Sequence, residues 1–308
     1  MRKIGVILLS LVLLISLAAC DSSNPDPEAV SETPLSEIYP DSDYANIVPV
    51  STASELADAL NNLAPDTKIV LSEGYYNMKD SVSADEFNGV TGWMFLINED
   101  NVAIVAADDA EDVYIYSSDS IPNGAYVTQN MITVTGDNIV LAGLRIGERG
   151  SQNKAIEALG NNLIIDSCTF VDSAMTYIGE YNVEGAEWTI DAVTVKNSVF
   201  EDESSLVICN GVSGAIAVTD NTFLDGTDFQ IIGSRLTGWN PVTVDVSEAV
   251  FSGNSFAAGA TFTVTYDAND PQNDSLWSLD ASSVASNFGE PEITKTEYKD
   301  RRIIYTAL

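Results

Sequence analysis

Histidine does not occur anywhere in the 308 residues. Neither a Ser-His-Asp nor a Cys-His catalytic group can therefore form, and zinc sites with histidine ligands are excluded as well. Cysteine is nearly as scarce, with three residues: Cys20, Cys168 and Cys209. Cys168 and Cys209 are too far apart in sequence for a typical zinc motif. Apolar residues precede both, so they suit either a disulfide in an exported protein or burial as small hydrophobic residues.

Bases are also few. The chain has 13 Lys and Arg against 46 Asp and Glu, and its formal net charge is −33 at pH 7. Binding to phosphates needs basic patches, so nucleic acid is not expected as a partner. Such an acidic surface suits solubility or a salty habitat, where ions screen the self-repulsion, and the alternative is specific binding of cations.

The N-terminus has the pattern of an export signal. Arg2 and Lys3 precede an apolar run over residues 4–19, which is too short for a confident membrane-spanning helix. The run ends in Leu17-Ala18-Ala19-Cys20, which resembles the lipobox of bacterial lipoproteins. The resemblance implies cleavage before Cys20 and attachment of acyl chains such as palmitate to that cysteine. An ordinary secretory signal with an incidental cysteine is the alternative.

These features predict three segments: a lipoprotein signal peptide (1–19), a lipidated Cys20 with an acidic tether (20–48), and a folded domain (49–308). The tether contains prolines and acids but no base, so we expect it to be disordered and extended. Several acyl chains on one residue suffice for stable anchoring. The expected location is the cell membrane or the cell surface, outside the cytoplasm.

Internal repeats are the strongest signal in the predicted domain. Residues 136–141 (Gly-Asp-Asn-Ile-Val-Leu) recur 24 residues later as residues 160–165 (Gly-Asn-Asn-Leu-Ile-Ile). A second motif ends in an aromatic residue at Phe170, Phe200, Phe223 and Phe256. A degenerate copy ends at Ile146, and the spacings from there onward are 24, 30, 23 and 33 residues.

Each repeat combines a β-branched strand, a polar corner and a second short strand, and only stacked copies can bury its apolar face. We therefore predict an all-β fold, a single-stranded right-handed parallel β-helix with the four phenylalanines pointing inward. Corner asparagines tolerate the left-handed conformation, and their amides can bond from rung to rung. A propeller, which needs a longer and more even repeat, and a sandwich, which needs alternating strands, are the alternatives.

Both ends of the predicted solenoid have capping signals. Thr52 and Glu55 form a capping box, and Leu56 and Leu60 follow at helical spacing, so a short amphipathic helix is expected over the first rung. At the other end, residues 302–305 (Arg-Ile-Ile-Tyr) predict a final strand or hairpin.

Residues 50–56 (Val-Ser-Thr-Ala-Ser-Glu-Leu) and 69–76 (Ile-Val-Leu-Ser-Glu-Gly-Tyr-Tyr) resemble the opening of pectate-lyase-like β-helix proteins. The similarity is greatest to the chondroitinase-B and alginate-lyase group and to β-helix lipoproteins. It covers residues 49 to about 260, and its motifs specify architecture rather than chemistry.

In that superfamily, uronate lyases use Lys or Arg as the base and often calcium as the cation. Lys196 and Arg235 are the candidates that the resemblance suggests, but neither lies in one of the superfamily's catalytic motifs, so no catalytic role is assigned. A solvated corner residue is the alternative for Lys196, and an ion pair with Asp225 or Asp228 is the alternative for Arg235.

Acidic corners supply oxygen ligands of the kind that calcium takes. The candidates are Asp108, Asp109, Glu111 and Asp112 in one corner, and Glu201, Asp202 and Glu203 in another. Charged turn residues that keep the solenoid soluble are the alternative. Trp239 is a candidate stacking platform for a sugar ring, with a core or capping role as the alternative.

Two functions remain open from the sequence. The first is a membrane-anchored lipoprotein whose β-helix binds a glycan or a cell-envelope protein without catalysis. The second is a calcium-assisted polysaccharide lyase acting on a uronate-containing polymer. We favour the first, because bases are scarce and the superfamily's catalytic motifs are missing.

Overall fold

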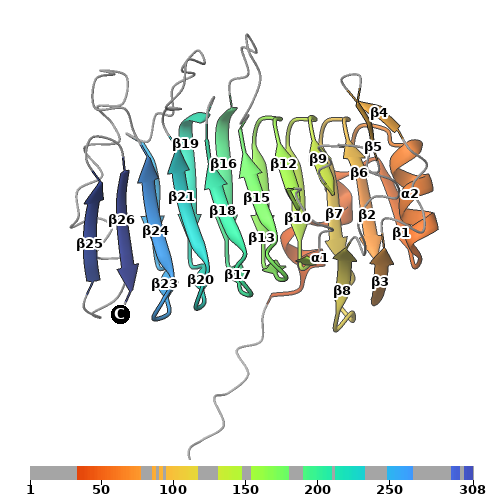
Figure 1. The fold of residues 1–308 in the computed structure, drawn as a ribbon. Helices are drawn as coiled ribbons and strands as arrows, with labels where there is room; N and C mark the ends of the chain where they lie inside the picture. Colours follow the sequence, from red (N-terminus) through yellow and green to blue (C-terminus); the bar gives the residue numbers. More distant parts are fainter. Residues whose placement is uncertain are drawn as a thin grey trace, which may run out of the picture. The chain divides into compact units, whose positions relative to one another are not determined.

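The computed structural model describes residues 33–77, 85–87, 90–92, 95–116, 131–147, 154–179, 190–209, 212–232, 248–265, 293–298 and 302–307. The chain divides into two units, Met1–Thr33 and Pro34–Leu308, and the described helices and strands all belong to the second. Figure 1 shows their strands stacked side by side. The described helices are α1 (Leu35–Ile38), the short 3-10 helix η1 (Asp41–Asp43) and α2 (Ala53–Asn61).

Three large sheets run along the second unit. The first sheet has eight strands in the order β1 (Asn46–Val50), β2 (Thr67–Leu71), β7 (Val102–Ala106), β10 (Ile139–Ala142), β13 (Leu163–Asp166), β16 (Ile190–Lys196), β19 (Val212–Thr219) and β22 (Val250–Ser252). The second sheet has seven, in the order β3 (Gly74–Asn77), β8 (Val113–Tyr116), β11 (Arg145–Gly147), β14 (Thr169–Phe170), β17 (Val199–Phe200), β20 (Thr222–Phe223) and β23 (Ser255–Phe256).

The third sheet has nine strands: β6 (Phe95–Ile97), β9 (Ile132–Val134), β12 (Ile156–Ala158), β15 (Met175–Ile178), β18 (Ser205–Ile208), β21 (Asp228–Ile232), β24 (Thr261–Thr265), β26 (Arg302–Ala307) and β25 (Ile293–Tyr298). A separate hairpin pairs β4 (Asp85–Phe87) with β5 (Val90–Gly92). From β7 to β24 the chain visits the first, second and third sheets in turn, and each strand pairs in parallel with its counterpart one turn later. The predicted parallel β-helix is confirmed.

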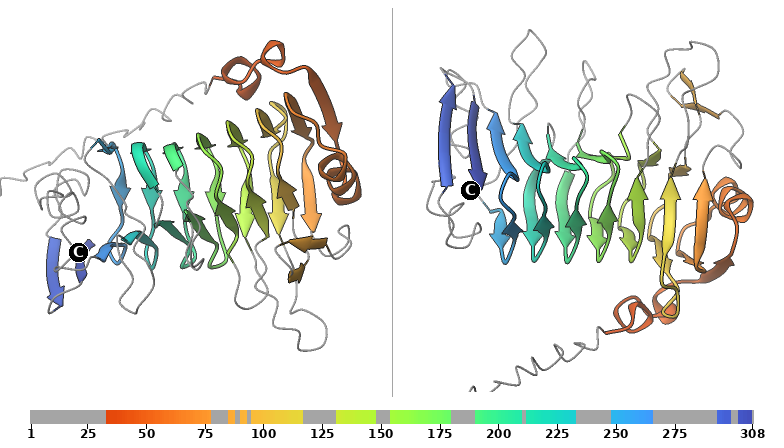
Figure 2. Two further views of the ribbon diagram at one scale, coloured as in Figure 1. Left: turned by 90° about the horizontal axis from the view of Figure 1, so that it is seen from above. Right: turned by 60° about the horizontal axis from the view of Figure 1, so that its bottom comes forward.

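Different elements lie at the two ends of the stack (Figure 2). At one end α2 buries Leu56, Ala57 and Leu60 against the first rungs. Its predicted cap is confirmed, because the Glu55 backbone N–H donates to Thr52 Oγ1 at 3.2 Å. At the other end β25 and β26 form an antiparallel hairpin that extends the third sheet from β24. The predicted final hairpin is therefore also present.

Phenylalanines form a column inside the β-helix. In register along the second sheet lie Ile146, Phe170, Phe200, Phe223 and Phe256. The four rings stack with successive centroid separations of 4.7, 4.8 and 4.7 Å. All four are buried. The prediction that they point inward on successive rungs is confirmed.

The corners between the third and first sheets explain the repeated Gly-Asx-Asn motif. Asn138 and Asn162 both have left-handed φ values, 58° and 56°. Asn162 Nδ2 donates to Asn138 Oδ1 at 2.8 Å, so the predicted amide bond between rungs is confirmed. The glycine of the motif is needed because there is no space for a side chain. A Cβ on Gly160 would lie 1.9 Å from the carbonyl oxygen of Gly136.

Residues 34–48 were predicted to belong to an extended tether, and for them that prediction is wrong. Residues 34–45, which include α1 and η1 and are called the strap below, pack on the outer face of the first sheet, and β1 then pairs with β2. The outward side chains of β7 and β10 are apolar, and Leu35, Tyr39 and Tyr44 of the strap cover them. This burial offsets the entropy of ordering the strap. Residues 1–32, including Cys20, lie outside the described residues.

Among the residues that the structure describes, no helix has the length and apolar character needed to span a membrane.

Candidate functional site

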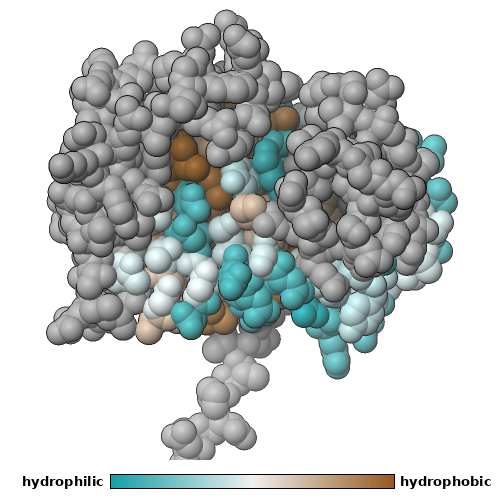
Figure 3. Space-filling view, viewed as in Figure 1, coloured by the Kyte–Doolittle hydropathy of each residue, from teal (hydrophilic) through white to brown (hydrophobic). Residues whose placement is uncertain are grey.

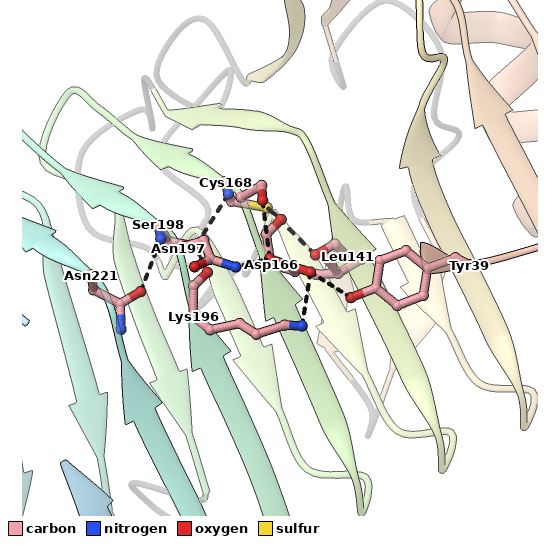
Figure 4. A network of polar contacts seen from close by, with 9 residues as sticks. Tyr39, Leu141, Asp166, Cys168, Lys196, Asn197, Ser198 and Asn221 are labelled. Atoms are coloured by element: carbon pink, nitrogen blue, oxygen red, sulfur yellow. Dashed lines mark hydrogen bonds and ion pairs between the residues drawn. The ribbon is translucent and has the colours of Figure 1, made fainter. Parts of the chain in front are cut away.

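A buried carboxylate connects the strap to the first sheet (Figure 4). Asp166, at the end of β13, is 1% exposed. Its Oδ2 accepts a hydrogen bond from the Tyr39 hydroxyl of the strap at 2.8 Å and lies 3.1 Å from Lys196 Nζ of β16. Its Oδ1 accepts from Asn197 Nδ2 at 2.9 Å and from Ser167 Oγ at 3.0 Å. Four donors therefore satisfy one carboxylate.

The donors decide the charge of this group. Burial by itself raises the pKa of Asp166, but hydrogen bonds from Asn197, Tyr39 and Lys196 outweigh it and leave the pKa below its ordinary value. The pKa of Tyr39 is raised, first by burial and then by its hydrogen bond to Asp166. Asp166 is thus an anion and Tyr39 a neutral donor at neutral pH. The arrangement fastens the strap and leaves neither group available for proton transfer to a substrate.

The corner beside Asp166 continues the network into the core. Cys168 N donates to Ser198 Oγ at 3.1 Å, and Ser198 N donates to Asn221 Oδ1 at 3.0 Å. Burial raises the pKa of the Cys168 thiol to about 12, so it is no nucleophile. Cys168 and Cys209 are both buried and are not joined in a disulfide.

The candidate bases from the sequence have different outcomes. Lys196 is partly exposed, and its ammonium forms an ion pair with Asp166, which makes it part of the strap network. Arg235 lies outside the described residues, and so does Trp239. Lys68, which the sequence did not single out, is buried and donates to Tyr39 O at 2.7 Å and to Asp41 Oδ1 at 2.8 Å. It is a second fastening of the strap.

The candidate calcium ligands are spread over two turns. Asp108 accepts hydrogen bonds from the backbone and the hydroxyl of Ser36, which lower its pKa. Asp109 and Glu111 are exposed in the same turn. The other candidates occupy the turn between β17 and β18, where Asp202 and Glu203 are exposed and Glu201 is partly buried.

No three His, Cys, Asp or Glu side chains of the described segments come together as a metal-binding group. Calcium binding stays a prediction.

On the side shown in Figure 3, hydrophilic residues gather over the lower part of the described surface and hydrophobic residues are visible higher up.

A cluster of tyrosines lies on the outer face of the second sheet. Tyr75 of β3 pairs with Tyr114 of β8, and Tyr114 pairs with Arg145 of β11, so the three side chains form one outward row. Tyr75 is 67% exposed. Its ring centroid lies 6.0 Å from that of Tyr114 and 6.4 Å from that of Tyr116, nearly perpendicular to both. We call Tyr75, Tyr114, Tyr116 and Arg145 the tyrosine platform.

Neighbouring groups hold the platform in place. Tyr114 and Tyr116 stack with centroids 4.9 Å apart, and Tyr114 is only 6% exposed. The Tyr114 hydroxyl donates to Asp172 Oδ2 at 2.9 Å. The guanidinium carbon of Arg145 lies 4.3 Å from the centre of the Tyr114 ring, and its Nη1 lies 3.6 Å from Asp112 Oδ2. A fixed aromatic surface therefore carries one exposed ring, a guanidinium edge and a carboxylate.

The sequence contains a signal for this platform that the repeats do not reveal. Tyr114 and Tyr116 alternate in sequence with the inward Val113 and Ile115, so both tyrosines lie on the outward face of the strand. Large aromatic residues on the outward face of a strand need an explanation that core packing does not supply.

Comparisons with protein-family models, with curated proteins and with solved structures found no match for this chain.

Proposed function

We propose that this protein is a lipoprotein, anchored outside the cytoplasm through Cys20, whose pectate-lyase-like β-helix binds a polysaccharide on the tyrosine platform without cleaving it. The lipobox-like Leu17-Ala18-Ala19-Cys20 supports the anchor. A rigid parallel β-helix suits a display role, because each rung is held by its neighbours and its outer faces are extended surfaces.

The observation that carries the glycan-binding proposal is the exposure of Tyr75 on a preorganised aromatic surface. Its 67% exposure contrasts with the buried Tyr114 beside it. An aromatic ring offers an apolar face for the C–H side of a sugar ring, while nearby polar groups bond its hydroxyls. The guanidinium of Arg145 supplies donors, and the carboxylate of Asp112 supplies acceptors.

The alternative function, cleavage of a uronate polymer by a lyase reaction, is less well supported. A lyase needs a base that is free to take a proton, and Lys196 donates to Asp166 instead. Its position also lies on the first sheet, whereas the platform lies on the second. No step of catalysis is therefore assigned to the platform.

Affinity electrophoresis in gels that contain soluble polysaccharides tests the proposal. Tyr75→Ala should weaken binding about tenfold, or about 1.4 kcal/mol, as expected for truncation of an aromatic anchor. Tyr75→Phe keeps the ring and should retain most of the binding.

The matched control is Val250→Ala, which removes an apolar side chain that is 52% exposed on the first sheet. Equal losses in Tyr75→Ala and in this control would contradict the proposal. Absence of any polysaccharide binding, together with loss of an envelope-protein contact in Tyr75→Ala, would instead indicate a protein partner.

A further inference from the structure

The charges around the tyrosine platform bear on which sugars it can hold. Arg145 is the platform's cation, and its guanidinium is already placed between the Tyr114 ring and the Asp112 carboxylate, at 4.3 and 3.6 Å. A carboxylate this close compensates the charge of the guanidinium. Arg145 therefore keeps N–H donors for hydroxyl groups, while the Arg145–Asp112 pair as a whole has little net charge to attract an anion.

Two further carboxylates border the platform. Asp172 accepts the hydrogen bond of the Tyr114 hydroxyl at 2.9 Å and is itself exposed. Glu73, also exposed, stands two residues before Tyr75, next to Gly74, whose N–H donates to Asp112 O at 3.0 Å. Among the described residues, Asp112, Asp172 and Glu73 and the single base Arg145 therefore lie around the exposed ring.

The net charge of the whole chain also disfavours the binding of anions. At −33 it repels anions beyond the platform, over a screening length of about 8 Å at physiological salt and about 30 Å at 0.01 M. An acidic polymer with a carboxylate on every sugar would approach against this field. A neutral sugar would meet the same donors and acceptors without that penalty.

We infer that the tyrosine platform is selective for uncharged polysaccharides and discriminates against polyuronates. The inference rests on the proposed glycan binding and specifies its ligand class. Stacking on Tyr75 supplies the contact, Arg145 donates to hydroxyl groups, and Asp112 accepts from them. A uronate carboxylate would instead face the three acids.

Matched pairs of probes separate charge from sugar shape. The full chain, purified in nonionic detergent, is titrated with neutral glucan, galactan and mannan oligosaccharides and with the same oligosaccharides oxidised at C6 to uronates. We expect each uronate to bind at least about tenfold more weakly than its neutral parent at 0.01 M salt, because repulsion is least screened there. The gap should narrow as salt is raised, while binding of the neutral probe stays constant.

Neutralising variants test the cause. Asp112→Asn removes the carboxylate that compensates Arg145, so uronate binding should improve roughly threefold or more at low salt. Glu248→Gln removes an exposed charge beside β22, far along the first sheet, and should change neither affinity. Tyr75→Ala should lower the affinities for the neutral and the uronate probe by the same factor.

The outcomes separate the two proposals. Two results would overturn the selectivity and leave glycan binding intact. In the first, uronates bind through Tyr75 as tightly as their neutral parents. In the second, the affinity for uronates falls as the salt concentration is raised. Failure of every probe to bind, with Tyr75→Ala no different, would remove both. A neutral preference that Asp112→Asn leaves unchanged would refute the electrostatic cause.

Discussion

Tyr39→Phe should weaken the attachment of the strap to the first sheet without unfolding the β-helix. The substitution keeps the ring that packs with Val105 and Val140 and removes only the hydroxyl that donates to Asp166 at 2.8 Å. A hydrogen bond to a charged group contributes about 1.5–3 kcal/mol. Because Asp166 keeps three other donors, we expect a loss of about 2 kcal/mol, in the lower half of that range.

Hydrogen exchange measures this effect where it occurs. A loss of about 2 kcal/mol raises the population of the open strap about thirtyfold, and amides such as Tyr39 N, which donates to Leu35 O, should exchange faster by that factor. Amides between rungs, such as Val199 N donating to Cys168 O, should keep their rates. The control Tyr44→Phe removes a hydroxyl from the same strap without touching Asp166.

A double-mutant cycle measures the contribution of the Tyr39–Asp166 hydrogen bond to the stability of the strap. Asp166→Asn removes the charge that Tyr39 and Lys196 share, and in that background Tyr39→Phe should cost distinctly less than in the native chain. Additive effects, unchanged exchange in Tyr39→Phe, or an equal acceleration in Tyr44→Phe would each refute the view that this hydrogen bond fastens the strap.

Four other outcomes follow from single groups. Phe200→Ala removes a buried ring stacked on both sides and should lower the free energy of unfolding by about 3–5 kcal/mol in chemical denaturation; a loss under about 1 kcal/mol would contradict the column. Thr176→Val should raise the melting temperature by removing a buried hydroxyl that has no hydrogen-bond partner among the described residues, and a lower melting temperature would show that the hydroxyl is bonded. Because the folded pKa of Asp166 is lowered, its carboxylate stabilises the protein above the unfolded pKa of about 3.9 and stops doing so as pH falls through the folded value, so the stability gap between the native chain and Asp166→Asn should shrink below about pH 4. Cys20→Ala should abolish incorporation of labelled palmitate, and unchanged labelling would refute the lipid anchor.

The inward face of the β-helix was predictable because it repeats. Each inward residue must match the one below it, so the same motif recurs and ends at Phe170, Phe200, Phe223 and Phe256. The motif is enough to infer their register although the spacings of 30, 23 and 33 residues are uneven. The corner asparagines are predictable for the same reason, since Asn101, Asn138 and Asn162 adopt the left-handed conformation at one place in three successive turns, and the amides of Asn138 and Asn162 bond between rungs.

The strap was not predictable from its own composition. Prolines and acids surround Leu35, Tyr39 and Tyr44, and that composition is typical of an extended tether. The signal lay in the strands that the strap covers. Residues 102–106 are apolar without alternation, which is typical of a strand buried on both faces and therefore implies a covering element.

The outward residues of the β-helix are not determined by the stacking of its rungs. An inward position is constrained by its neighbours on two rungs, whereas an outward position is constrained only by what lies against it. On the first sheet that constraint is the strap, and it explains apolar outward residues such as Val105 and Val140 together with the buried Asp166. On the second sheet Tyr75 is large, aromatic and largely exposed, and it is not part of the described core. A residue that the solenoid does not need for its own packing is where a binding function is best sought, which makes Tyr75 the first position to alter.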